Sequence, residues 1–393
     1  MKFPKGFRGG AAAAGLKKSG KKDIGLILSD VPCAGAGVFT RNLFAGANIA
    51  VCRRHLAKGT MRGIVVHAGQ ANACTGTEGE KVAEATAAAV ARLIGADPAE
   101  FVVGSTGVIG VLPDLGRIEA GLKSIAEAGL SPEGIEDVGR AMMTTDLVPK
   151  SAEGTCRMGG KQVRILGLAK GSGMIHPNMG TMLAYILTDA RLPRPELRAA
   201  LRAASDASFN CMTVDGDTST SDMLVALANG AAGNESISAE ELVKFREALT
   251  KVCQSLARQV ASDGEGATRL VTIRVAKAKS AADAKRAAMA VGTSSLVKTA
   301  IFGRDPNWGR IACAVGYSGA SFDPKRVSIK LGGTRIFAQG RPVAQDRAAL
   351  AQYLRDEKEV RMEIELNAGA AEATVWTCDF SYDYVKINAE YTT

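Results

Sequence analysis

The segment from Lys170 to Thr181 could release a nucleophile, because it places a threonine directly after a glycine in the run KGSGMIHPNMGT. If the bond between Gly180 and Thr181 breaks, Thr181 gains a free α-amine beside its hydroxyl. That amine, with a pKa of about 7.7–8.0, could accept the hydroxyl proton at neutral pH. One residue would then be both nucleophile and general base. A Gly-Thr pair also occurs where a strand follows a turn, so the rest of the chain must decide between these interpretations.

The composition of this segment favours a bent loop. Gly171, Gly173 and Pro177 disfavour a regular helix in the run that precedes Thr181. Backbone strain in such a loop would assist an N-to-O acyl shift, which is the usual route to self-cleavage. Gly180 has no side chain that could block attack on its own carbonyl.

Further short motifs follow one another along the whole chain. They include SDVP at 29–32, GVFT at 37–40, STGVIG at 105–110, MTTD at 143–146, VDGDTST at 214–220, DGEGAT at 263–268, NWGR at 307–310 and INAEYTT at 387–393. In number and order, these motifs and the run that ends at Thr181 resemble those of one family. That family is the ornithine acetyltransferases of arginine biosynthesis, also called glutamate N-acetyltransferases.

The resemblance implies an acetyltransferase that moves acetyl from N2-acetyl-L-ornithine to L-glutamate. The mechanism would be ping-pong, through an acetyl-Thr181 enzyme. It implies neither cofactor nor metal, and it leaves open whether acetyl-CoA is a second donor. It also implies self-cleavage into an α chain, 1–180, and a β chain, 181–393, which stay associated as a heterotetramer with two copies of each. The division would lie between polypeptides rather than between domains.

Acyl transfer passes through a tetrahedral oxyanion, which needs two hydrogen-bond donors held in place before the reaction. The resemblance assigns this role to the hydroxyl of Thr106 and the backbone N–H of Gly107. Without the resemblance, the same Ser-Thr-Gly sequence is typical of a turn that ends a strand.

A substrate with an α-carboxylate and an amine needs a cation, hydroxyl donors and an acceptor for the amine. Lys170 is the candidate cation, and by resemblance Glu265 is the acid that faces the amine. The resemblance completes the substrate-binding set with Thr144, Thr181, Asn388 and Thr393. Thr145 would be as good a donor as Thr144, and spacing does not separate them. Because the set includes two residues of the last motif, the C-terminal segment is expected to fold back over the pocket.

Two other enzyme classes share part of these patterns. An autoprocessing aminopeptidase or amidase of related architecture would use nearly the same site, with water in place of the accepting amine. The run from Arg164 to Ala169 also matches the Arg-x-x-Gly-x-Ala pattern of acetyl-CoA-dependent N-acetyltransferases. In that class the turn must open a helix, and the glycines and proline that follow here disfavour one.

The acidic residues and histidines near these motifs do not indicate a metal site or a catalytic triad. Asp215, Asp217 and Asp222 lack the EF-hand pattern and any neighbouring His or Cys, so we interpret them as turn and cap residues. His176 is close to Thr181 in the sequence, but an α-amine base makes a catalytic histidine unnecessary.

The net charge of +9 does not indicate a nucleic-acid-binding protein. Residues 1–22 hold seven Lys and Arg and no acid, and aromatic residues make up only 5% of the chain. The eight cysteines form no CxxC pair, and no apolar run is typical of a signal peptide or a membrane span. We expect a cytoplasmic enzyme that acts on small molecules and contacts neither nucleic acid nor a membrane.

Hydrophobic periodicity predicts the elements that position these residues. Helices are expected over about 78–94, 114–128, 131–143, 194–207, 238–261, 280–290 and 345–355. Strands are expected over about 63–67, 101–104, 163–168, 182–188, 269–275, 327–331, 360–366 and 374–381, with a hairpin at Gly332-Gly333. Because helices and strands interleave without a strict βαβ rhythm, we predict an α+β fold rather than a doubly wound one. It would be the layered helix and sheet fold of the ornithine acetyltransferases and autoprocessing aminopeptidases.

Overall fold

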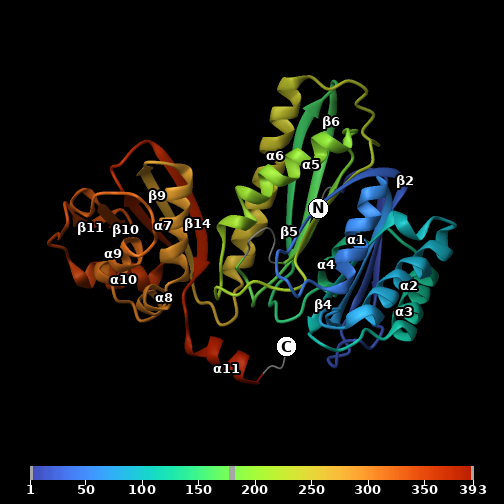
Figure 1. Ribbon diagram of the computed structural model, residues 1–393, viewed down its shortest axis with the longest axis horizontal. Helices are drawn as coiled ribbons and strands as arrows, with labels where there is room; N and C mark the ends of the chain where they lie inside the picture. Colours follow the sequence, from blue (N-terminus) through green and yellow to red (C-terminus); the bar gives the residue numbers. More distant parts are fainter. Residues whose placement is uncertain (1–2, 177–181, 391–393) are drawn as a thin grey trace.

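The computed structural model describes residues 3–176 and 182–390, so Gly180, Thr181 and Thr393 lie outside the described residues. Two β-sheets organise the described chain, an eight-stranded sheet in a larger lobe and a six-stranded sheet in a smaller one (Figure 1). The lobes share one hydrophobic cluster that extends from the larger sheet to the smaller one. They are also joined where the N–H of Thr213 donates to the carbonyl of Trp376 at 2.9 Å.

The larger sheet has the strand order β4-β3-β2-β8-β7-β6-β5, and β1 pairs with the beginning of β2. The β3–β4 and β7–β8 pairs are parallel. The other pairs in the described sheet are antiparallel. The strands are β1 (Phe7–Ala12), β2 (Ile24–Phe39), β3 (Thr60–Gln70), β4 (Phe101–Val108), β5 (Lys150–Met158), β6 (Lys161–Lys170), β7 (Leu183–Thr188) and β8 (Met223–Ala228).

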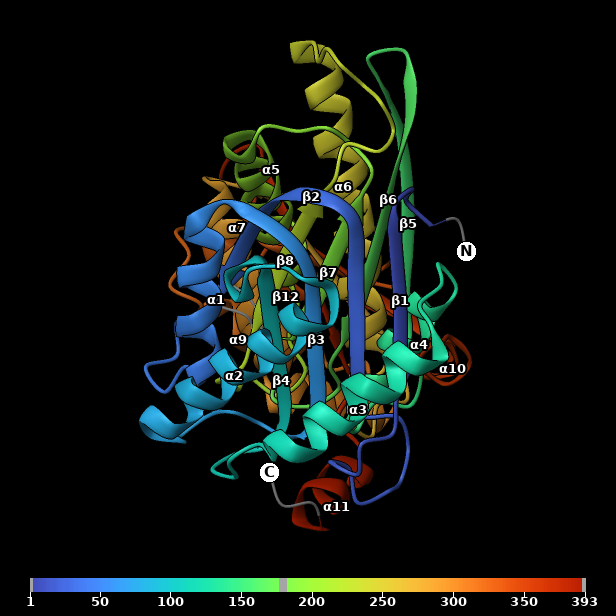
Figure 2. The ribbon, with the colours of Figure 1, turned by 90° about the vertical axis from the view of Figure 1, so that its right-hand side faces the viewer.

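Helices cover both faces of this sheet, and β7 shows the reason. Its alternate residues Ala184 and Ile186 belong to a hydrophobic cluster with α5 and α6, whereas Leu183, Tyr185 and Leu187 pack with α1–α4. Successive side chains of a strand point to opposite faces, so the sheet lies between two helical layers. Figure 2 shows α2, α3 and α4 in front of the strands. The helices are α1 (Ala47–Lys58), α2 (Gly76–Ile94), α3 (Leu115–Ala128), α4 (Gly134–Ala141), α5 (Arg194–Asp206) and α6 (Ala239–Ser262).

The smaller sheet has the order β12-β11-β10-β13-β9-β14, and α7 packs on β9 and β14. Its strands are β9 (Leu270–Ala278), β10 (Ser328–Leu331), β11 (Thr334–Ala338), β12 (Arg341–Pro342), β13 (Glu359–Glu365) and β14 (Ala371–Cys378). The remaining helices are α7 (Ala281–Thr293), α8 (Ser295–Phe302), α9 (Trp308–Gly316), α10 (Arg347–Asp356) and α11 (Tyr382–Glu390). Short 3₁₀ turns lie at Pro98–Glu100, Phe209–Cys211 and Pro324–Arg326.

The layered α+β fold predicted from the sequence is confirmed, and each predicted helix and strand overlaps an observed element. The hairpin at Gly332-Gly333 joins β10 to β11, and both glycines have the positive φ that such a turn requires. The sequence missed α1, α8, α9 and α11. It also missed β1, β2, β5, β8 and β12, and it gave no bounds for β11, the second strand of the predicted hairpin. No helix in the described ranges is long and apolar enough to span a membrane.

The larger sheet contains strands from both sides of Thr181. β7 and β8 follow Thr181 in the sequence, yet they lie between β2 and β6 in the sheet. A cut before Thr181 would therefore give two polypeptides that share one sheet. It would not fall between two domains. The cut itself stays a prediction.

Gly104→Ala is expected to destabilise the strand that leads to the candidate oxyanion site. A Cβ at Gly104 would collide with the hydroxyl of Tyr185, a fully buried side chain that has no room to move aside. Overpacking of this kind typically costs about 1–3 kcal/mol of unfolding free energy. Gly316→Ala is the matched control, because its Cβ would meet no atom within 4 Å. Urea unfolding measures both variants, and equal stabilities would contradict this account of the packing.

Candidate active site

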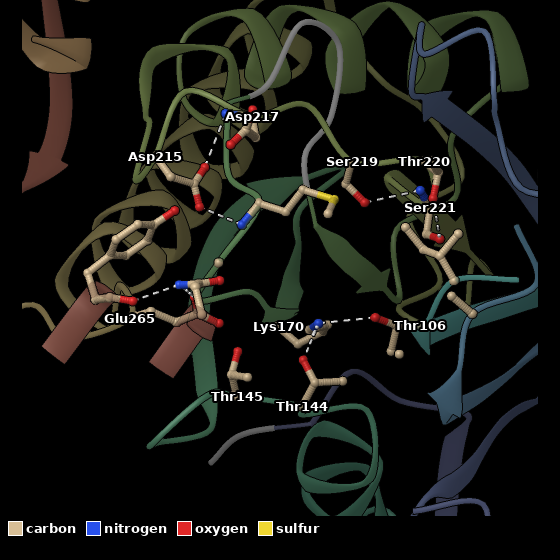
Figure 3. A pocket seen from close by; sticks show the side chains of 17 residues that line it. Thr106, Thr144, Thr145, Lys170, Asp215, Asp217, Ser219, Thr220, Ser221 and Glu265 are labelled. Carbon is tan, nitrogen blue, oxygen red and sulfur yellow. Dashed lines mark hydrogen bonds between the residues drawn. The ribbon is translucent and has the colours of Figure 1, made fainter. Parts of the chain in front are cut away.

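Most of the residues that the sequence marked for function line one cavity (Figure 3). Several polar groups converge in its wall, as is typical of a small-molecule site. The predicted residues in its wall are Thr106, Gly107, Thr144, Lys170, Glu265 and Asn388, together with the alternative Thr145. The predicted residues Gly180, Thr181 and Thr393 lie outside the described residues. The roles of all these residues stay predictions.

Lys170 lies at the centre of the polar groups in this wall. It is the last residue of β6 and only 9% exposed. Its Nζ donates to Thr144 Oγ1 at 2.7 Å and to Thr106 Oγ1 at 3.1 Å (Figure 3). Burial lowers the pKa of Lys170, and the nearby carboxylate of Asp146 opposes that effect. Lys170 thus joins a candidate oxyanion donor to a candidate substrate-binding hydroxyl.

The pairing register of β6 and β7 places the residues just after Thr181 beside Lys170. In the antiparallel pair of β6 and β7, Leu183 is the partner of Lys170. On its other side Leu183 pairs with Met223, at the start of β8. Residue 183 is therefore fixed beside Lys170 by two strands, two residues from the candidate nucleophile in the sequence.

Thr106 and Gly107 are at the end of β4, where a close backbone approach shapes the wall. Gly107 pairs with Gly69 of β3 and has a φ of 127°. A Cβ at Gly107 would collide with the backbone of Gly69, so a larger residue does not fit. The wall therefore carries the hydroxyl of Thr106 next to the backbone of Gly107. The Thr106 hydroxyl and the Gly107 N–H are the two groups predicted to hold the oxyanion.

Thr144 and Thr145 both face the cavity but differ in their bonding. Thr144 is tied down, because its hydroxyl accepts from Lys170 and its N–H donates to Asp146 Oδ2 at 3.0 Å. Thr145 lines the same wall and makes no hydrogen bond to the described part of the chain. Its hydroxyl is thus free for a ligand, and the choice between the two threonines stays open.

Glu265 and Asn388 form the opposite side of the cavity. Asn388 Nδ2 donates to Glu265 Oε2 at 2.8 Å and to the carbonyl of Tyr384 at 3.0 Å. The C-terminal helix α11 therefore folds back onto the cavity, as the resemblance implied for this segment. Figure 1 shows α11 extending from the smaller lobe towards the larger one. Gly173 makes room for the carboxylate, because a Cβ there would collide with it.

A buried ionic network that the sequence did not reveal lies behind Lys170. Lys150 Nζ donates to Asp146 Oδ1 at 2.7 Å and to Asp263 Oδ2 at 2.6 Å. The side chains of Lys150 and Asp146 are 0% exposed, and that of Asp263 is 7% exposed. No motif marks Lys150, which occurs in an ordinary polar run at the start of β5.

The two carboxylates of this network also bind backbone N–H groups of the cavity wall. Asp146 accepts from Gly171 at 2.6 Å and from Thr144 at 3.0 Å, while Asp263 accepts from Leu147 at 3.0 Å. One lysine therefore connects the loop of Thr144, the end of β6 and the turn that carries Glu265. Burial alone would raise the pKa of Asp146, but Lys170 and Lys150 outweigh it and lower that pKa to about 2.

Asp215 binds the backbone a few residues before the candidate cleavage site, the bond between Gly180 and Thr181. Its carboxylate accepts from the N–H groups of Met174 at 2.6 Å, Ile175 at 2.8 Å and Asp217 at 3.1 Å, as a turn residue would. Met174 has a φ of 56°, a strained value for a non-glycine residue. Strain is therefore present in the run that leads to Thr181, and the half-buried carboxylate of Asp215 holds that backbone in place.

The other candidates outside the resemblance have structural partners or lie off the cavity. His176 is bonded to Thr213 Oγ1 through Nδ1 at 3.2 Å and does not line the cavity. Asp222 is 1% exposed, and burial raises its pKa. Within the described ranges, no three His, Cys, Asp or Glu residues are grouped to hold a metal. The sequence missed the wall formed by Ser219, Thr220 and Ser221, although the VDGDTST motif ends there.

Lys150→Met is expected to lower the free energy of unfolding by about 3–5 kcal/mol, because it leaves two buried carboxylates without their cation. The same change should weaken substrate binding, since the network fixes Thr144 and the turn of Glu265. Lys123→Met is the control, because the Lys123 side chain is 75% exposed and its ion pair with Glu127, at 3.8 Å, lies on the surface. Urea unfolding and substrate titration measure the two effects, and a Lys150→Met protein as stable as the control would contradict the assignment.

The stabilising effect of Asp146 is expected to disappear in acid. Its folded-state pKa of about 2 lies below the ordinary 3.8, so its stabilisation is complete above about pH 4 and is lost as the pH falls towards 2. The difference in unfolding free energy between wild type and Asp146→Asn should narrow by about 2 kcal/mol over that range. Asp137→Asn, at an exposed surface ion pair, should give a small and flat difference. Urea unfolding at successive pH values tests this, and a constant Asp146→Asn difference would refute it.

Comparison with known proteins identifies the family. The chain matches the model of the ArgJ family over residues 8–393. Two relatives named arginine biosynthesis bifunctional protein ArgJ are similar over nearly their full lengths. The one from Symbiobacterium thermophilum is 50% identical, over 99% of this chain and 98% of the relative. The one from Geobacter sulfurreducens is 46% identical, over 99% of each.

A solved structure agrees with this result. The crystal structure of arginine biosynthesis bifunctional protein ArgJ from Bacillus halodurans aligns with a TM-score of 0.52 and 41% identity. The alignment covers 53% of this chain and 98% of that one. The family resemblance predicted from the motifs is thus confirmed, and the chain belongs to the ArgJ family.

Proposed function

We propose that this enzyme transfers acetyl from N2-acetyl-L-ornithine to L-glutamate, and that it also acetylates glutamate from acetyl-CoA. Membership of the ArgJ family and relatives named as bifunctional proteins of arginine biosynthesis support both activities. The observation that carries the proposal is the cavity in which Lys170, bonded to Thr106 and Thr144, faces Glu265 and Asn388. A buried cation and a carboxylate in one small cavity fit a substrate that has an α-carboxylate and an amine.

In the proposed mechanism, the Oγ of Thr181 attacks the acetyl carbonyl of acetylornithine and loses its proton to the α-amine of the same residue. The hydroxyl of Thr106 and the N–H of Gly107 stabilise the oxyanion. The amide C–N bond breaks, the proton passes to the departing ornithine amine, and acetyl-Thr181 remains. The glutamate amine then attacks this ester, and the Oγ of Thr181 leaves and regains a proton. Lys170 would bind the α-carboxylate, and Glu265 would hold the substrate amine.

We further propose that the chain cleaves itself between Gly180 and Thr181 and that the two products stay together. The interleaving of β7 and β8 with the earlier strands supports this association, because separating the products would break the larger sheet. The assembly would be a heterotetramer of two α and two β chains in the cytoplasm. The chemistry would need neither cofactor nor metal, since the α-amine supplies the base.

The test combines intact-protein mass spectrometry with an acetyl-transfer assay. Wild type is expected to give two fragments that meet at Gly180/Thr181 and to acetylate glutamate from acetylornithine. Thr181→Ala should give one uncut chain without transfer, because nucleophile and base are removed together. Thr181→Ser, which keeps a hydroxyl, should retain some cleavage. An uncut wild type with full activity would contradict the proposal, and acetyl release to water without transfer to glutamate would favour an amidase.

A further inference from the structure

A groove on the larger lobe, distinct from the active-site cavity, is lined by five arginines and, among the described residues, by no acidic one. It lies over the end of β2, between α1 and α5. We refer to it as the arginine groove. The arginines are Arg41, Arg53, Arg194, Arg198 and Arg202.

Two of these arginines are held in place by backbone carbonyls rather than by carboxylates. Arg53 Nη2 donates to the carbonyl of Thr40 at 3.2 Å, and its guanidinium lies 5.5 Å from the centre of the Phe39 ring. Arg194 donates to the carbonyls at the C-terminal end of α1, at 3.2 Å for Ala57. Their positions are fixed, but their positive charges are not neutralised by any carboxylate in the described chain.

The side chains of the other three arginines have no partner in the described part of the chain. Arg41, Arg198 and Arg202 are exposed, and their guanidinium groups form neither a hydrogen bond nor an ion pair there. Arg198 and Arg202 are four residues apart on one face of α5, where like charges repel. Several uncompensated guanidinium groups in one groove produce a local positive potential, and their planar donors suit phosphate oxygens.

The floor of the groove adds backbone groups to these charges. Residues 35–39 of β2 pair with β8 along one edge, whereas the pairing of β2 with β3 ends at Ala34. Within the described chain, the other edge of this segment thus has no strand partner, and it presents backbone N–H and C=O groups. Phe39 and Leu56 supply apolar surface beside it. Guanidinium groups, free backbone amides and apolar patches together suit a nucleotide-like ligand with phosphates.

One end of the arginine groove adjoins the wall of the active-site cavity. Phe39, which lines the groove, pairs with Met223, and Ser221 of the cavity wall is two residues before Met223. Thr40, the residue after Phe39, is bonded to the same wall. Its Oγ1 donates to the carbonyl of Ser219 at 2.8 Å. The groove and the cavity therefore approach each other at the paired ends of β2 and β8.

We propose that the arginine groove binds the phosphate groups of acetyl-CoA and directs its thioester end towards the active-site cavity. This inference rests on the proposed acetylation of glutamate from acetyl-CoA. The thioester would form the same acetyl-enzyme as acetylornithine. The hydroxyl oxygen forms the new ester bond, the C–S bond breaks, and the hydroxyl proton goes to the departing sulfur. The groove supplies binding energy, while the catalytic groups remain those of the cavity.

The test compares two donors in one enzyme. The variant Arg41→Gln/Arg198→Gln/Arg202→Gln is expected to raise the KM for acetyl-CoA by about tenfold or more, because charge-assisted hydrogen bonds to phosphate are lost. The kcat with acetyl-CoA and all constants with acetylornithine should stay unchanged. Acetyl-pantetheine, which lacks the nucleotide phosphates, should be used equally by variant and wild type. Arg335→Gln, at an exposed arginine of β11 in the smaller sheet, is the matched control.

Each alternative outcome has a distinct meaning. An unchanged KM for acetyl-CoA in the triple variant, with acetylornithine transfer intact, would overturn the inference. If the variant loses binding of inorganic pyrophosphate but keeps its KM for acetyl-CoA, the groove serves a free phosphorylated metabolite and the assignment to the donor is wrong. A wild type that uses acetylornithine but never acetyl-CoA would also overturn the assignment and would leave ornithine transfer standing. Absence of transfer from acetylornithine would instead contradict the proposed function.

Discussion

The burial of Lys150 between two carboxylates is the constraint on which the shape of the cavity depends. Bringing three charges out of water is costly, and the cost is offset only when geometry and hydrogen bonding are complete. Here the carboxylates of Asp146 and Asp263 also accept hydrogen bonds from backbone N–H groups of the cavity wall. The network is therefore satisfied in one arrangement of that wall, and this arrangement also places Lys170 beside Thr144.

The larger sheet supplies the second constraint, because it joins segments that are far apart in the sequence. β6 ends with Lys170, β4 ends close to Thr106, and β7 begins opposite Lys170. Hydrogen bonds between neighbouring strands hold these strand ends in fixed relative positions. Lys170 and Thr106 therefore meet without the help of a flexible loop. The same pairing would hold the two products of a cut together, since neither product contains all the strands of the larger sheet.

The two cationic regions differ in their physical character. Lys170 is buried, has hydroxyl partners and lies in a small cavity, where low polarity strengthens its pairing with a carboxylate. The arginine groove is open to water, and charges of that kind act at longer range and weaken as salt is added. A buried cation suits the discrimination of a small amino acid, whereas an exposed arginine cluster suits the capture of a larger anion.

The sequence by itself determined the family, the layered α+β class and seven of the residues that line the cavity. These follow from local signals: motifs in order, helical periodicity and apolar runs. It missed β2, because the proline and glycines of this segment disfavour a strand. The pairing of β2 with β3 and β8 overrides that local preference. It missed α1, which begins without a side-chain cap. Only the tertiary structure revealed Lys150 and the arginine groove, because burial and the absence of a partner depend on contacts between distant segments.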